Sequence, residues 1–261
     1  STFSVLLFMF TMFAGVNYYR YPFAQINYME VEDSSIDELY QLNMYLAEQS
    51  FILREELSLQ KEFINDEGIF QLRHMHWKEM TDIADKAFSN LSIYYPILEG
   101  NYGLPKPVLA SRFMSKMNIT GIFWPFSLEA NVNIDAPDYT IPSTMTHEMA
   151  HLRGFMREDE ANYIAYLACI YSEHLAFRYS GLMLALTYAG NALYKEDPLL
   201  YKEIRDLYHE GMERDLRSKS YYWSQFNDTT ISAVSTKLND TYLKVNNQKD
   251  GVKSYGRMVD L

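Results

Sequence analysis

The residues best suited to chemistry lie in residues 143–160, which read STMTHEMAHLRGFMREDE. His147 and His151 are four residues apart, so on a helix they lie one turn apart on the same face and can bind one ion. Glu148 is rotated about 100° from His147 around the helix axis, which places its carboxylate beside the ion. This HExxH arrangement is typical of zinc hydrolases, in which the histidines bind Zn²⁺ and the glutamate acts as general base on a zinc-activated water. The motif therefore predicts His147 and His151 as metal ligands and Glu148 as a catalytic residue.

Flanking residues predict a short helix for this motif. We expect Ser143 or Thr144 to cap its start directly after Pro142, and Gly154 to end it. The alternative is an ordinary helix that happens to carry two histidines. A chance HExxH is rare in a chain with six histidines, so the cap, the helix and the stop together favour a metal site.

A catalytic zinc site needs a third protein ligand. The pattern HExxHxxGxxH would place a histidine six residues after His151, but that residue is Arg157, which cannot bind a cation. The metzincin pattern therefore fails. The next predicted helix opens with three acids, Glu158, Asp159 and Glu160, which are the candidates.

Helix periodicity distinguishes between these acids. Glu158 shares one helix face with Ala161, Asn162 and Ala165. The alanines would let this helix approach the histidine helix closely, and Asn162 can hydrogen-bond a ligand. Glu160 points nearly the opposite way. We therefore predict Glu158 as the third ligand and keep Glu160 and Asp159 as alternatives, because spacing alone does not fix a ligand.

The segment 147–168, HEMAHLRGFMREDEANYIAYLA, resembles a bacterial, membrane-anchored family of unknown function in the gluzincin-type peptidase clan, whose members read close to HELAHQRGFxREDEANFxAYLA. Glu158-x-x-Ala161-Asn162 is also similar to the Glu-x-x-Ala-Asp segment of CAAX-processing and HtpX-type membrane peptidases, and to a segment of ImmA-type peptidases. Asn162 departs from the aspartate of the membrane peptidases. The resemblance implies bound Zn²⁺ and a location at the bacterial cell membrane, with the catalytic domain on the extracytoplasmic side.

Two further segments contribute candidate residues. Residues 121–134, GIFWPFSLEANVNI, are predicted to be extended, and in gluzincins a strand at this position lines the cleft and pairs with an extended substrate. Glu129 in this strand can contact a substrate amine or satisfy a turn. A hydrolase also needs a donor for the oxyanion, and Tyr255 or Arg257, in DGVKSYGR, are the candidates.

Composition restricts the chain's function and partners. The 261 residues carry a formal net charge of −11, which disfavours nucleic-acid binding. Cys169 is the single cysteine, so no intrachain disulfide can form and a zinc site must use histidine and carboxylate ligands. We predict one predominantly α-helical α+β domain over residues 22–261, with helices in 34–95, a small β and loop region in 96–142, and helices in 143–246.

An apolar run precedes this domain. Residues 3–16, FSVLLFMFTMFAGV, carry no charge, and Tyr18 to Tyr21 follow as an aromatic and basic collar. The run is shorter than the roughly 20 residues that span a bilayer. We expect residues 1–21 to form part of a transmembrane anchor, with a signal-peptide remnant or a buried core helix as alternatives.

The motif favours a zinc metallopeptidase of the HExxH-plus-Glu gluzincin type that acts on a peptide or protein substrate. Two alternatives remain from other classes. One is a membrane-tethered regulatory or binding module with a structural zinc site, which would close the fourth coordination position with another side chain. The other is an amidase acting on a cell-wall peptide, which the same motif would serve equally well.

Overall fold

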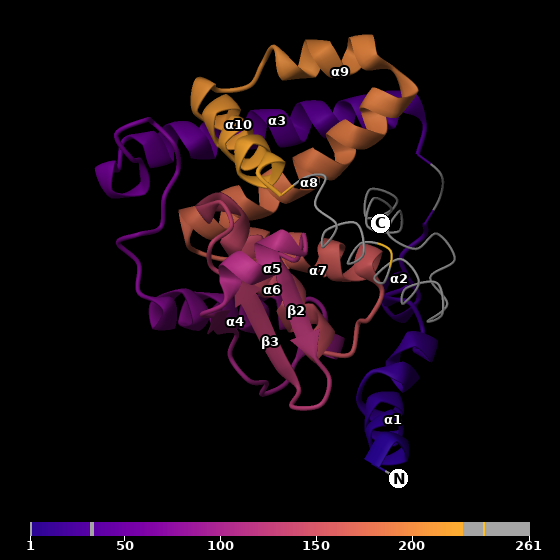
Figure 1. The fold of residues 1–261 in the computed structure, drawn as a ribbon. Coiled ribbons are helices and arrows are strands. Elements are labelled where there is room, and N and C mark those ends of the chain that lie inside the picture. Colours follow the sequence, from indigo (N-terminus) through magenta and orange to yellow (C-terminus); the bar gives the residue numbers. More distant parts are fainter. Residues whose placement is uncertain (1, 32–33, 227–236, 238–261) are drawn as a thin grey trace.

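The computed structural model describes residues 2–31, 34–226 and 237 (Figure 1). It is mostly helical, with one small mixed sheet directly before the helix that carries His147 and His151, as predicted. The helices are α1 (Thr2–Phe13), α2 (Phe23–Ile26), α3 (Ile36–Ser58), α4 (Trp77–Ser92), α5 (Ser111–Lys116), α6 (Ile141–Leu152), α7 (Glu158–Ile170), α8 (Leu175–Glu196), α9 (Pro198–Arg205) and α10 (Glu210–Ser224).

The two longest helices form the frame of the molecule. Helix α3 starts at a capping box, in which Ser35 and Glu38 satisfy each other's backbone N–H groups. Its apolar side chains recur at helical spacing and are buried against α8, among them Leu46, Leu53 and Leu57. Helices α6 and α7 also pack against α8, so the predicted metal-binding helices lie against the helical core.

Three short strands cover one side of α6. They are β1 (Lys106–Val108), β2 (Gly121–Trp124) and β3 (Glu129–Asn133), in the order β1-β3-β2. Strand β3 is parallel to β1 and antiparallel to β2. Strand β2 is therefore an edge strand. Both β2 and β3 contact α6, which confirms the predicted strands before the histidine helix.

Gly190 and Pro198 predict a helix break near residues 190–198, and the structure has one there. Helix α8 continues through Gly190 and ends at Glu196. Gly190 is buried inside α8, where a Cβ atom would lie 3.0 Å from the ring of Tyr201 on α9. The glycine thus permits close packing of two helices instead of ending one. The break comes at Asp197, whose side chain caps α9 ahead of Pro198.

Helix α1 consists of apolar residues, Ser4 and the threonines Thr2 and Thr11, and none of its side chains is buried. None of the helices in the described part of the chain has both the length and the apolar character needed to cross a membrane. The prediction that residues 1–21 belong to an anchor stays a prediction. The last part of the predicted helical region, residues 227–246, lies outside the described residues apart from Lys237.

Candidate metal centre

Helix α6 begins at Ile141, so Ser143 and Thr144 lie inside it and do not cap it as predicted. Pro142 sits in the first turn, where its missing N–H costs no helical hydrogen bond. The backbone N–H of Ser143 instead donates to Oγ of Ser180 on α8, at 2.9 Å. Because α8 supplies this acceptor, the helix starts earlier than its own sequence indicates.

The predicted stop at Gly154 is confirmed. Its φ is +84°, a left-handed conformation that glycine adopts without strain. Its N–H donates to the carbonyl of His151, and the N–H of Phe155 donates to the carbonyl of Ala150, which together form a Schellman motif. This turn reverses the chain within a few residues, so α7 packs on α6 and brings its first residue back to the histidines.

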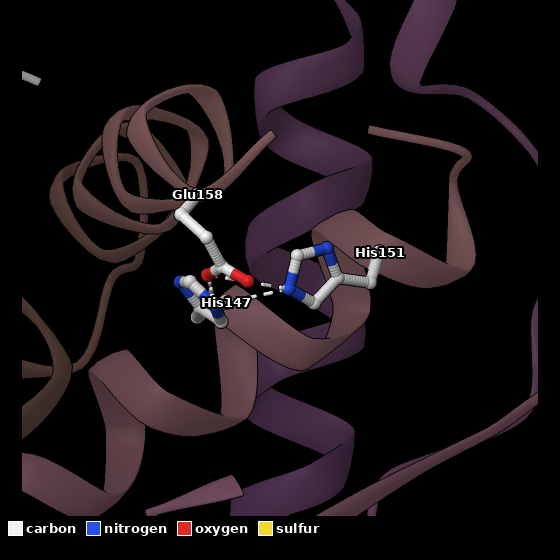
Figure 2. A group of neighbouring side chains, drawn as sticks. All are labelled: His147, His151 and Glu158. Atoms are coloured by element: carbon white, nitrogen blue, oxygen red, sulfur yellow. Dashed lines mark hydrogen bonds and ion pairs between the residues drawn. The ribbon is translucent and has the colours of Figure 1, made fainter. Parts of the chain in front are cut away.

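His147 and His151 on α6 and Glu158 at the start of α7 point toward one another (Figure 2). Nε2 of His147 lies 3.1 Å from Nε2 of His151 and 3.1 Å from Oε2 of Glu158, and the remaining distance, from His151 Nε2 to Glu158 Oε2, is 3.8 Å. A tetrahedral zinc ion with bonds of about 2.05 Å holds its ligand atoms about 3.3 Å apart. The three atoms therefore fit one zinc ion.

Neighbouring groups orient both imidazoles. Nδ1 of His151 lies 2.7 Å from the carbonyl of Phe155, to which it donates in the tautomer that leaves the Nε2 lone pair available for a metal. The side chain of Asn162 hydrogen-bonds His147 and donates through Nδ2 to the hydroxyl of Tyr188 on α8, at 3.2 Å. Asn162 thus takes the supporting role expected of it.

Burial and mutual charge set the protonation of this group. Burial lowers the pKa of His151 to about 4, which keeps its imidazole neutral. Burial also acts to lower the pKa of His147, but the hydrogen bond and the charge of Glu158 outweigh it and the pKa is raised. Only a neutral imidazole can bind a metal. His151 is therefore ready to bind a cation, whereas His147 would have to exchange its proton for the cation.

Glu148 lies next to this group but is not part of it. Its buried carboxylate lies between α6 and the edge strand β2, where Phe123 provides a backbone hydrogen bond. Oε2 of Glu148 is buried and has no hydrogen-bond partner among the described residues. Burial raises the pKa of Glu148 to about 8, and the charge of Glu158 adds to the effect.

The close approach of β2 depends on Gly121. A Cβ atom at this position would lie 2.4 Å from Oε1 of Glu148, so no other residue fits without displacing the carboxylate. Gly121 was not predicted as a site residue, although a glycine that opens an apolar strand is a signal of close approach. Tyr188 was not predicted either, because no pattern distinguishes it from the other tyrosines of the chain.

The other two acids of the predicted trio lie away from the histidines. Asp159 pairs with Arg157, Oδ2 to Nη2 at 2.8 Å. Glu160 accepts a hydrogen bond from the backbone N–H of Phe23 at 3.0 Å and lies 3.7 Å from Nε of Arg157. Glu158 is thus the acid that the structure places with the histidine pair.

Glu129, the candidate on β3, is not part of the His147, His151 and Glu158 group. Glu129 forms an ion pair with Lys106 across β3 and β1, on the exposed side of the sheet. Tyr255 and Arg257, the predicted oxyanion donors, lie outside the described residues. Their role stays a prediction.

A family model described as protein of unknown function (DUF3810) matches residues 1–261, so the chain belongs to this family. This match confirms the predicted membership of a family of unknown function. No curated protein and no solved structure matches the chain. The family description assigns no activity, so the case for one depends on the geometry given above.

Proposed function

We propose that this DUF3810 protein is a zinc-dependent hydrolase of the gluzincin type that cleaves peptide bonds. The observation that carries the proposal is the convergence of His147, His151 and Glu158 on one point beside the separately held carboxylate of Glu148. A merely structural zinc site has no use for a buried glutamate with a free oxygen next to its ligands.

The donor set favours zinc. Two imidazoles and one carboxylate are typical of catalytic zinc sites, whereas Mg²⁺ and Ca²⁺ prefer oxygen ligands alone. Cys169, the single thiol, is buried beside Thr146 and is not part of the group. Bound Zn²⁺ would act as a Lewis acid on the scissile carbonyl and lower the pKa of a water molecule.

The protein's own groups can supply the remaining steps. Glu148 can take a proton from water and give it to the departing amine, since burial brings its pKa close to neutral pH. Strand β2 pairs with β3 along one edge, and on its other edge the backbone of Phe123 hydrogen-bonds Glu148 of α6. An extended peptide can pair with the rest of this outer edge, which would place its backbone beside the metal group.

We further propose that the chain is attached to the bacterial cell membrane through its N-terminal helix, with the hydrolase domain on the extracytoplasmic side. Helix α1 carries no charge, its polar side chains are those of Thr2, Ser4 and Thr11, and the described part of the chain buries none of its side chains. Tyr19 and Tyr21, which follow it, are exposed to 83% and 70%. Exposed aromatic side chains at the end of an apolar helix are typical of the membrane–water interface.

The test combines metal analysis with a peptide-library digest. We expect one zinc per chain by elemental analysis and cleavage that a zinc chelator abolishes. Glu148→Gln should keep the zinc but lose cleavage by a factor of about 10² to 10⁴, the usual contribution of a general base. Glu62→Gln, at an exposed glutamate remote from the motif, is the matched control. Cleavage by the Glu148→Gln variant at the wild-type rate would refute the mechanism.

A further inference from the structure

The N-terminal segment is fastened to the turn that joins the two metal-binding helices. Nη1 of Arg20 donates to the carbonyl of Arg153 at 2.7 Å, and the Arg20 guanidinium lies 4.2 Å from the centroid of the Phe155 ring. The backbone N–H of Phe23 donates to Glu160, beyond the turn and near the start of α7. Residues 20–23 therefore connect the segment that follows α1 to the two helices that carry the candidate metal ligands.

The surface of α1 is uncharged on all sides and mostly apolar. Phe3 is exposed to 73% and Phe8 to 65%, and no charged residue lies between positions 2 and 19. An uncharged helix with apolar side chains on every face belongs in a protein core or in lipid. The described residues bury none of its side chains, which leaves lipid as the matching environment.

A second apolar surface lies at the loop between β2 and β3. Trp124 is exposed to 47% and Leu128 to 46%, and the rings of Trp124 and Phe126 lie 5.5 Å apart. Leu128 adopts a φ of +53°, a left-handed conformation that is uncommon for leucine. The whole stretch 121–128 lacks a charged residue, so we call residues 124–128 the apolar loop.

The apolar loop and α1 adjoin each other. Phe123 of β2 and Phe10 of α1 both pack on one small buried cluster, formed by Ala14, Tyr18 and Met156. Both α1 and the apolar loop extend toward the lower side of the molecule in Figure 1. Strand β2 is thus held next to the helix through Phe123, and Trp124, the first residue of the apolar loop, follows Phe123 directly in the chain.

We propose that the apolar loop is a second membrane contact, which enters the lipid–water interface beside α1. The inference rests on the attachment of α1 to the membrane proposed above. Trp124 has the size, exposure and position of an interfacial anchor. The ring of Phe123, one residue away, lies 6.4 Å from the ring of His151. The metal centre would then face substrates that lie at the membrane surface.

Tryptophan quenching by lipid tests this contact. The full chain is reconstituted into phosphatidylcholine vesicles with or without brominated acyl chains, and its tryptophan fluorescence is compared. We expect brominated lipid to quench Trp124, and Trp124→Phe to lose most of that quenching. The remaining tryptophans, Trp77 and Trp223, lie outside the apolar loop and stay as internal references.

A pair of charge substitutions completes the experiment. Leu128→Asp should weaken the quenching of Trp124, whereas Leu199→Asp, at an exposed leucine on α9 at the far side of the molecule, should not. Quenching that Trp124→Phe leaves unchanged would overturn the proposal, as would vesicle-bound protein without quenching. Failure of the chain to float with vesicles would overturn both membrane contacts but leave the hydrolase proposal, which the peptide digest tests separately.

Discussion

Two glutamates, Glu158 and Glu160, lie two residues apart at the start of α7 and serve different purposes. A helix rotates by about 200° over two residues, so their side chains leave opposite faces. Glu158 faces the histidines, and Glu160 accepts a hydrogen bond from the N–H of Phe23 in the N-terminal segment. The acidic start of α7 therefore joins the metal group to the segment that follows α1.

These roles predict different effects of the same substitution at the two positions. Glu158→Gln removes an anionic ligand and should weaken zinc binding at least about tenfold, since ligand-set changes of this kind have large effects on affinity. Glu160→Gln is the matched control and should leave zinc affinity unchanged. Competition with a chromophoric chelator measures both. The opposite order of affinities would identify Glu160 as the ligand.

Replacing Gly121 should lower the rate of cleavage and leave zinc binding unchanged. In Gly121→Ala the new methyl would meet Glu148 at 2.4 Å and push the carboxylate out of place. A displacement of about 1 Å at a catalytic group costs about 10²-fold in rate. We therefore expect cleavage to fall by about that factor while zinc content stays at the wild-type level.

The chain provides a control for this substitution. A Cβ atom added at Gly103 would meet no other group within 4 Å, so Gly103→Ala should leave cleavage unchanged. If Gly121→Ala cleaved as fast as the wild type, Glu148 would not need its position beside β2.

At the scale of the helices, two histidines act as N-caps. Nδ1 of His174 accepts the N–H of Ala176 at the start of α8, and Nδ1 of His209 accepts the N–H of Gly211 at the start of α10. Only a neutral imidazole can accept these bonds. Burial lowers the pKa of both histidines below the ordinary value.

The lowered pKa values predict how stability changes with pH. Below about pH 6.5, the ordinary histidine pKa, the unfolded chain binds protons that the folded chain does not. The stability from these caps is thus complete above that pH and is lost as the pH falls through the folded-state pKa values. Urea unfolding of the metal-free protein at pH 7.5 and pH 5 measures this loss, about 1 kcal/mol for each cap.

Asparagine provides the comparison, because it caps helices and does not titrate. The variant with His174→Asn and His209→Asn should keep its stability at pH 7.5 and lose less of it at pH 5 than the wild type. An equal loss in both proteins would show that the caps do not contribute to the pH dependence.

The features that were predicted correctly are those determined by residues close together in the sequence. His147, His151 and Gly154 lie within eight residues, and their spacing alone predicts the helix, its shared face and its stop. The predicted start of α6 was wrong because its acceptor, Ser180, comes from another helix. The break predicted near residues 190–198 is at Asp197, because Gly190 packs against the ring of Tyr201 on α9 and stays inside α8.

Contacts between residues that are far apart in the sequence could not be predicted from it. Arg54 on α3 and Asp215 on α10 form a buried ion pair, Nε to Oδ2 at 2.8 Å, and Tyr179 on α8 donates to the same carboxylate. The pair is 161 residues apart in sequence. No local period marks such a contact, and the same holds for Tyr188 beside Asn162.

Over the whole molecule, the N-terminal segment and the metal centre form one unit. Arg20 contacts the turn between α6 and α7, and this turn positions both His151 and Glu158. A rigid connection of this kind would set the orientation of the metal centre relative to a membrane that holds α1. Replacing Arg20 should loosen that connection without disturbing the metal ligands.

Distances between spin labels can measure this coupling. The chain suits such labelling because Cys169 is its single cysteine and is buried, and burial raises the pKa of its thiol to about 12. Labels attached at Val5→Cys on α1 and Leu199→Cys on α9 should give a narrow distance distribution in the otherwise wild-type chain. Both positions are exposed, to 58% and 73%, so the labels should not disturb packing.

Arg20→Ala should broaden this distribution, because it removes the hydrogen bond to Arg153 and the contact with Phe155. Arg112→Ala, which removes a surface ion pair with Asp135, is the control and should leave the width unchanged. Zinc content should be the same in all three proteins, because none of these changes touches a ligand. An equal width in the Arg20→Ala protein would mean that the contacts of Arg20 with the metal-binding turn do not set the orientation of α1. Apolar packing on Ala14 and Tyr18 would then hold the helix by itself.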